Sequence, residues 1–345
     1  MRKVAALVLK VYAIVSVSLL ACAALVLTAS GFSVSLNLPE NQNPQTFSSF
    51  DLRVAPGQRQ EISVSVHNPG EEDIVVEVNL FAVGTNRNGA IDYTSPGRID
   101  QSAPHTFSDI ATLPTDAYIR VPAGHVAAIP ILLEIPPEGF EGTILGTVHL
   151  LLEITEEERA QAGMLVNRFA HAVAVRLQER DTAIEPDFAL GEVSAQTVSL
   201  LPAIVAEIRN PVPCFALGAA ASARIYPAGQ SEPLFTADTG VDFAPSSVFE
   251  FTLLSMDGVS IADGEYLARV VVEHQGRAWE FYREFSVAAP EDLQAPAATQ
   301  VQQQAPYDPS GASPTPQVWV IIAAALALCA LVAALAIWLK RRAGG

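Results

Sequence analysis

Residues 60–70 read QEISVSVHNPG, and this stretch sets a pattern that the rest of the chain repeats. Ile62, Val64 and Val66 alternate with polar residues and run into Asn-Pro-Gly. Such alternation predicts a β-strand with one buried face, and the Asn-Pro-Gly sequence predicts a turn at its end. Residues 198–211 have a similar pattern, because an apolar run again ends in Asn-Pro. The two halves of the chain are therefore predicted to use the same kind of strand and turn.

Further short strands are predicted on both sides of these two. The apolar or alternating runs lie at residues 32–38, 74–80, 129–135, 144–152, 217–226, 248–254, 266–273 and 278–287. Gly- and Pro-containing turns separate them, as is typical of antiparallel sandwiches. The sequence therefore predicts an all-β fold of two tandem immunoglobulin-like antiparallel β-sandwich domains, with a single transmembrane helix at the C-terminal end.

The expected organisation has seven parts. They are a signal peptide (1–31), a β-sandwich (32–155), a helical connector (156–170), a second β-sandwich (171–288), an Ala/Gln/Pro-rich stalk (289–317), a transmembrane helix (318–339) and a cytoplasmic basic tail (340–345). The stalk residues bury little and favour an extended chain.

Two apolar stretches at the ends of the chain predict its topology. Residues 318–339 carry no charge, are long enough to cross a bilayer as a helix, and have Trp319 and Trp338 at their ends. The flanking basic residues lie on the outer ends, and Lys and Arg stay on the cytoplasmic side. We therefore expect a single-pass plasma-membrane protein with its ectodomain on the cell-wall side and its C-terminus in the cytoplasm. The N-terminal segment fits a cleaved signal, an uncleaved anchor, or a lipid attachment at Cys22.

The charge distribution narrows the possible partners. All 37 acidic residues lie within residues 31–316, together with 14 of the 20 basic residues, so this part has a net charge of −23. Such a surface repels nucleic acid, which is not expected as a partner.

Motifs that would indicate catalysis are missing from the sequence. It contains no Gly-x-Ser-x-Gly elbow, no His-Glu-x-x-His and no phosphate-binding Gly-rich loop. The six His residues are scattered without ligand spacing, and the acidic runs fit solvated turns. We therefore expect a non-enzymatic protein with no cofactor and no metal site, although sequence alone leaves open a site assembled from distant strands.

An ordered set of short motifs in each half resembles a known family. In the first half they are Phe32-Ser33-Val34-Ser35, Pro39-Glu40-Asn41-Gln42, Phe50-Asp51-Leu52, Pro56-Gly57-Gln58, the run from Asn86 to Tyr93, Phe107-Ser108-Asp109 and the run from Phe140 to Gly146. In the second half they are the run from Phe188 to Val193, Ile208-Arg209-Asn210-Pro211, the run from Ala244 to Phe249, Gly264-Glu265-Tyr266 and Trp279-Glu280-Phe281. This order and spacing resemble the WxL-interacting proteins of Gram-positive cell surfaces.

The resemblance implies a binding role on the cell surface. It implies that the first domain binds peptidoglycan, that the second binds partner or host extracellular proteins, and that the protein assembles WxL-domain proteins into a surface complex that mediates attachment. The chain has no Trp-x-Leu motif, so it resembles the receptor and not the WxL protein. The alternative is a membrane-tethered, chaperone-like assembly module without glycan affinity, which would offer a sheet edge to a partner strand.

Glycan recognition is predicted at residues 86–93. Asn86, Asn88 and Asp92 supply polar groups for sugar hydroxyls, and Tyr93 supplies a ring for the C–H face of a sugar. Asp109 is predicted to join them. A structural interpretation also fits, because Asn88-Gly89 is a common hairpin turn and Tyr93 is suited to a core.

The predicted topology can be tested on intact cells. Added protease should digest residues 31–316 and spare the terminal helix, and deletion of residues 317–345 should release protein into the medium if the signal is cleaved. Protection of residues 31–316 in intact cells would contradict this topology.

Overall fold

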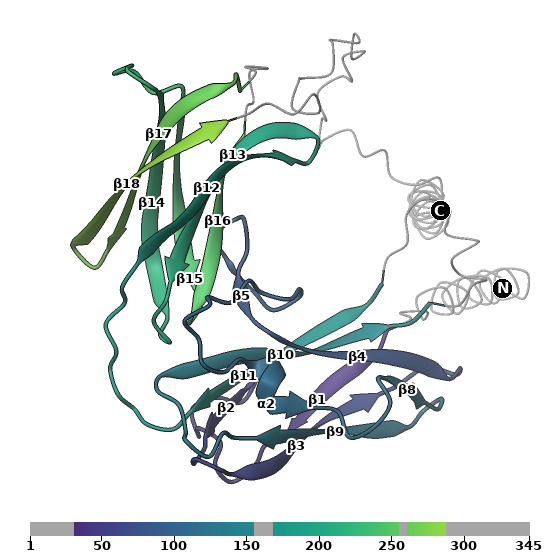
Figure 1. The fold of residues 1–345 in the computed structure, drawn as a ribbon. Helices are drawn as coiled ribbons and strands as arrows, with labels where there is room; N and C mark the ends of the chain where they lie inside the picture. Colours follow the sequence, from purple (N-terminus) through teal and green to yellow (C-terminus); the bar gives the residue numbers. More distant parts are fainter. Residues whose placement is uncertain (1–30, 155–167, 255–260, 288–345) are drawn as a thin grey trace, which may run out of the picture. The chain divides into compact units, whose positions relative to one another are not determined.

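The computed structural model describes residues 31–154, 168–254 and 261–287, which fall within one compact unit, Met1–Ala295. The expected signal peptide, helical connector, stalk, transmembrane helix and basic tail lie wholly or almost wholly outside these ranges. Within the described ranges, no helix is both long and apolar enough to span a bilayer. The described residues form two β-sandwiches (Figure 1).

The first sandwich packs a four-stranded sheet against a five-stranded sheet. The four-stranded sheet has the order β1 (Ser33–Asn37), β3 (Arg59–His67), β9 (Val126–Glu134), β7 (Ala111–Thr112). The five-stranded sheet has the order β2 (Phe50–Arg53), β11 (Ala170–Gln178), β10 (Thr143–Leu152), β4 (Ile74–Ala82), β8 (Tyr118–Val121). Neighbouring strands are antiparallel except β2 and β11, which run parallel.

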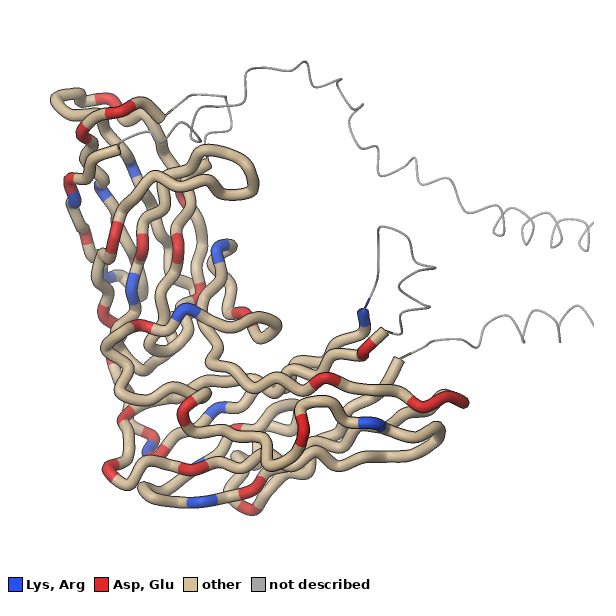
Figure 2. Tube along the Cα trace, turned by 45° about the vertical axis from the view of Figure 1, so that its right-hand side comes forward, with Lys and Arg blue, Asp and Glu red and all other residues tan. Residues whose placement is uncertain are grey.

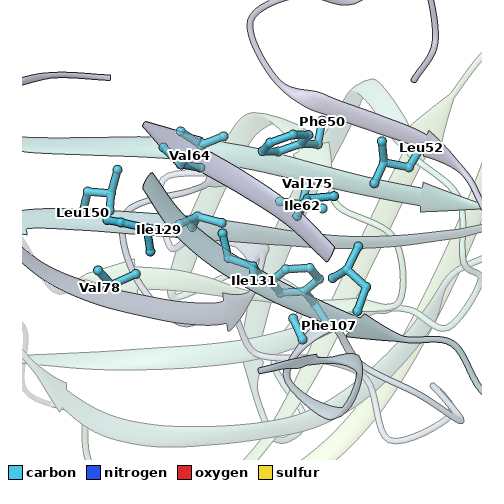
Figure 3. Packing of buried hydrophobic residues seen from close by; sticks show 14 of the residues in the cluster. Phe50, Leu52, Ile62, Val64, Val78, Phe107, Ile129, Ile131, Leu150 and Val175 are labelled. Carbon is cyan, nitrogen blue, oxygen red and sulfur yellow. The ribbon is translucent and has the colours of Figure 1, made fainter. Parts of the chain in front are cut away.

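Alternate residues of the central strands fill the space between these sheets. Ile62 and Val64 on β3 and Ile129 on β9 pack in one cluster with Phe50 on β2 and Val175 on β11 (Figure 3). Each of the five exposes 2% or less of its surface. The period-two pattern seen in the sequence is therefore the pattern of inward-facing side chains.

A short helix, α2 (Phe107–Ile110), closes one part of this core. Phe107 is fully buried and lies against β10 at Gly146. A Cβ atom on Gly146 would lie 1.9 Å from the Phe107 ring. A side chain at position 146 would therefore displace Phe107.

The second sandwich is antiparallel throughout. One sheet has the order β12 (Ala189–Val198), β13 (Leu201–Asn210), β16 (Ser247–Leu254), and the other has the order β15 (Phe235–Phe243), β14 (Ala216–Pro227), β17 (Gly264–His274), β18 (Arg277–Val287). A separate apolar core lies between them. The prediction of an all-β fold with two sandwiches is confirmed.

One strand of the first sandwich comes from residues expected in the second domain (171–288). Residues 171–178 lie in β11, which pairs with β10 and β2 of the first sandwich. The first sandwich therefore ends at Gln178. The sequence pattern of a strand does not specify which strands lie beside it, because pairing depends on contacts distant in sequence.

Asn68, in the turn after β3, connects this turn to the end of β8 by hydrogen bonds. Its Nδ2 donates to the carbonyl oxygens of Glu72, at 2.7 Å, and Val121, at 3.1 Å. Its Oδ1 accepts a hydrogen bond from the backbone N–H of Gly70 at 2.9 Å. Only 1% of Asn68 is exposed, so these bonds satisfy polar groups that water does not reach.

Asn210 repeats this arrangement after β13 in the second sandwich. Its Nδ2 donates to the carbonyl oxygens of Cys214 and Ala244, both at 2.9 Å, and its Oδ1 accepts from the N–H of Val212 at 3.3 Å. The residue is fully buried. In both halves, the Asn of the Asn-Pro sequence therefore donates hydrogen bonds from its side-chain amide to its own turn and to a second segment.

Replacing either amide should destabilise the protein. Asn68→Ala and Asn210→Ala each remove the Nδ2 donor from one buried and one partly buried carbonyl group. We expect each to lower the unfolding free energy by about 2–3 kcal/mol. Chemical denaturation of the protein measures this change. Asn88→Ala, at an exposed turn position, is the control and should change little; equal losses in all three variants would refute the structural role.

Candidate functional site

The loop predicted to bind glycan forms a hairpin that contacts the second sandwich. Strands β5 (Gly84–Thr85) and β6 (Ile91–Asp92) make this hairpin. At its tip the carbonyl oxygen of Gly89 accepts a hydrogen bond from the N–H of Asp242 at 2.7 Å. The Thr85 hydroxyl donates to the Asp242 carbonyl oxygen at 3.1 Å and accepts from the Ala244 N–H at 2.9 Å. The hairpin thus links the two domains.

The side chains of Asn86 and Asp92 already accept hydrogen bonds within the loop. The Asn86 Oδ1 accepts from the N–H groups of Asn88 and Ala90. The carboxylate of Asp92 accepts from the Thr94 and Ser95 hydroxyls at 2.6 and 2.7 Å. Burial raises the pKa of Asp92, but these hydrogen bonds outweigh burial and lower the pKa overall.

The other two predicted residues lie in different surroundings. Tyr93 packs in an apolar cluster with Val83, Leu145 and Ala244, and burial raises its pKa. Asp109 lies on α2, where its carboxylate accepts from the N–H and the hydroxyl of Thr106, both at 2.8 Å. These hydrogen bonds lower the pKa of Asp109. No finding tests glycan contact at Asn86, Asn88, Asp92, Tyr93 or Asp109, so that assignment stays a prediction.

Residues 98–100, which follow the hairpin, form an isolated β-bridge with the edge of the second sandwich. Ile99 forms an antiparallel bridge with Ser247. The Asp100 N–H donates to the Ser246 carbonyl oxygen at 2.7 Å, and the Val248 N–H donates to the Arg98 carbonyl oxygen at 2.9 Å. The edge of β16 is therefore partly covered by a segment of the first domain.

Ion pairs reinforce this contact. The Asp100 carboxylate is buried and accepts from the Nε and Nη2 atoms of Arg209 at 2.5 and 2.8 Å. Burial raises the pKa of Asp100, but hydrogen bonds from Arg209 and Ser102 outweigh it and lower the pKa to about 2.

A second set of ion pairs lies beside the first. The guanidinium of Arg98 bridges Glu207 and Glu250, and Arg87 binds the other Glu250 oxygen. Figure 2 shows acidic residues spread over both sandwiches, so these arginines offset part of the repulsion where the domains meet. No sequence motif marks these residues. Glu207 and Arg209 alternate with apolar residues in β13, and this alternation indicates that they face outward.

Two hollows lie beside this junction. A cleft of about 470 Å³ has walls from both sandwiches, and its lining includes His105, Glu138, Phe140, Glu141, Arg180 and Pro213. A smaller hollow of about 180 Å³ brings the predicted residues Asn86 and Asp92 together with Arg87, Arg98 and Glu250. Among residues 31–154, 168–254 and 261–287, no group of His, Cys, Asp and Glu could hold a metal ion.

Two joined immunoglobulin-like sandwiches with a cleft beside their junction define a two-domain all-β protein. The chain belongs to the WxL-interacting protein family. The model for the WxL Interacting Protein peptidoglycan binding domain matches residues 32–151, and the model for its host binding domain matches residues 160–295. The two models indicate a peptidoglycan-binding role and a host- or partner-binding role.

Solved structures that match part of this chain include those of bacterial chaperones. The Pseudomonas aeruginosa CupB2 chaperone is 14% identical, with 67% of this chain and 95% of that chain covered and a TM-score of 0.26. A chain from the Salmonella enterica SafA pilin–SafB chaperone complex is 14% identical, with 75% and 99% covered and a TM-score of 0.29. The search of curated proteins found no match.

The buried ion pair predicts a dependence of stability on pH. Because the pKa of Asp100 is about 2 in the folded protein and roughly 3.9 in an unfolded chain, its contribution is present above pH 4 and is lost as the pH falls toward 2. Asp100→Asn should lower the unfolding free energy at pH 7 by about 3 kcal/mol and flatten the loss of stability between pH 4 and 2.

Urea denaturation at several pH values measures both effects. Asp238→Asn is the matched control, because Asp238 pairs with Arg224 but its side chain is 65% exposed, and exposed pairs contribute little. Equal effects of the two substitutions would show that the Asp100–Arg209 pair has no special role.

Proposed function

We propose that this chain is a non-enzymatic cell-surface protein that holds peptidoglycan with its first sandwich and partner proteins with its second, and so assembles WxL-type surface complexes that mediate attachment. The match of two adjoining binding-domain models to the two halves of the chain is the observation that carries this proposal. The proposed location is the plasma membrane, with residues 318–339 as the anchor and the ectodomain on the cell-wall side.

The junction between the sandwiches supports a role in assembly. Backbone hydrogen bonds join the domains directly, since the carbonyl oxygens of Gly89 and Arg98 accept from the second sandwich and the Asp100 N–H donates to it. The buried pair between Asp100 and Arg209 adds to them. A partner bound to the second sandwich would therefore be held at a defined position relative to the peptidoglycan that the first sandwich binds. A flexible linker would leave this position undefined.

The proposal is tested by sedimentation with purified cell-wall sacculi. The ectodomain (residues 31–316) should sediment with intact sacculi, because its first sandwich binds peptidoglycan, and should stay soluble after muramidase digestion of the sacculi. The sacculus-bound protein should then retain a purified WxL-domain protein.

A soluble protein of similar net negative charge is the control for nonspecific adsorption. If the ectodomain captures the WxL-domain protein but does not sediment with sacculi, the chaperone-like module without glycan affinity is the correct function. If it sediments but captures no partner, the assembly role is wrong.

A further inference from the structure

The cleft between the two sandwiches has the size of a small-ligand site. Its volume of about 470 Å³ lies within the range of roughly 300–1,000 Å³ typical of such sites, which are common where domains meet. Its walls are the turn before β10, the segment before α2, the end of β11 and two turns of the second sandwich.

Hydrogen bonds fix these walls in place. The Thr143 N–H donates to the Pro213 carbonyl oxygen at 2.8 Å, and the Ser102 hydroxyl donates to the Pro211 carbonyl oxygen at 3.0 Å. The Glu179 carboxylate accepts from the Phe140 N–H at 2.9 Å. The first two bonds cross between the domains, so the cleft is preformed and requires both sandwiches.

Part of the lining is apolar. Phe140 is half-buried, packs against the first core and also lines the cleft. Pro213 and the buried Pro245 face the same cleft from the second sandwich. Aromatic and proline rings offer apolar surface to the C–H face of a sugar, so this wall suits a pyranose ring.

Charged groups of both signs accompany the apolar wall. Glu141 and Arg180 are exposed and line the cleft. Neither makes an ion pair or a side-chain hydrogen bond with another residue in the part of the chain that the structure describes. Glu138 faces His105 at 3.1 Å in the same cleft. An available carboxylate and an available guanidinium together suit a ligand that carries both an amino group and a carboxylate.

We infer that this cleft binds the amino sugar and attached peptide of peptidoglycan, with the sugar against Phe140 and the prolines, a peptide amino group at Glu141 and a peptide carboxylate at Arg180. This inference rests on the proposed peptidoglycan binding and adds its site and its ligand chemistry. The hairpin at residues 84–92 is less suited to this ligand, because many of its polar atoms already bind within the hairpin or to the second sandwich.

The test uses the full chain in detergent and disaccharide-peptide fragments released from sacculi by muramidase. Glu141→Gln with Arg180→Gln should weaken fragment binding in calorimetry by at least about tenfold, since charged hydrogen bonds are lost. Ala103→Trp should abolish binding by filling the cleft, of which Ala103 forms part. Acetylating the amino groups of the fragments should weaken wild-type binding and should have no further effect on the double variant.

The matched control is Glu71→Gln with Arg59→Gln, which makes the same charge changes on the first sandwich outside the cleft. The control should bind like wild type, and circular dichroism should show that every variant is folded. If the folded double variant binds fragments and sacculi as wild type does, the cleft assignment is overturned while peptidoglycan binding stands. If wild type binds neither, peptidoglycan binding itself fails, and the assignment with it.

Discussion

The ion pair between Asp100 and Arg209 is the contact on which the relation between the two sandwiches depends. A carboxylate removed from water is stable only when it is paired and hydrogen-bonded, and the partner of Asp100 comes from the other domain. Beside this pair, Ile99 bridges to Ser247 on the edge of β16. Separating the domains would break these charge-assisted hydrogen bonds and expose the edge of β16 at Ser247, and both effects oppose separation.

This constraint also creates the large cleft. Its walls include Ser102 and Thr143 from the first sandwich and Pro211 and Pro213 from the second, joined by hydrogen bonds. The cleft therefore exists only while the domains are joined. A protein that binds a rigid wall polymer gains from such a preformed site, because little conformational entropy is lost on binding.

The hairpin at residues 84–92 shows why loop chemistry alone is ambiguous. Asn86, Asp92 and Tyr93 are suited to sugar recognition, and the same groups are suited to turn formation and packing. In the structure, Asn86 and Asp92 bind the hairpin's own backbone and hydroxyls, and Tyr93 packs beside Ala244 of the second domain. The hairpin turn at Asn88-Gly89 could be predicted, but its contact with the second sandwich could not.

The sequence by itself determined the local structure. Alternating residues such as Ile62 and Val64 identify strands and their buried faces, because side chains of a strand alternate between two faces. The sequence also predicts the Asn-Pro turns after β3 and β13. In the structure the buried amides of Asn68 and Asn210 stabilise these turns by hydrogen bonds. Only the tertiary structure decided that β11 belongs to the first sandwich and that Asp100 meets Arg209. Those outcomes depend on pairing between segments far apart in the chain, and a strand's own pattern specifies its faces but not its neighbours.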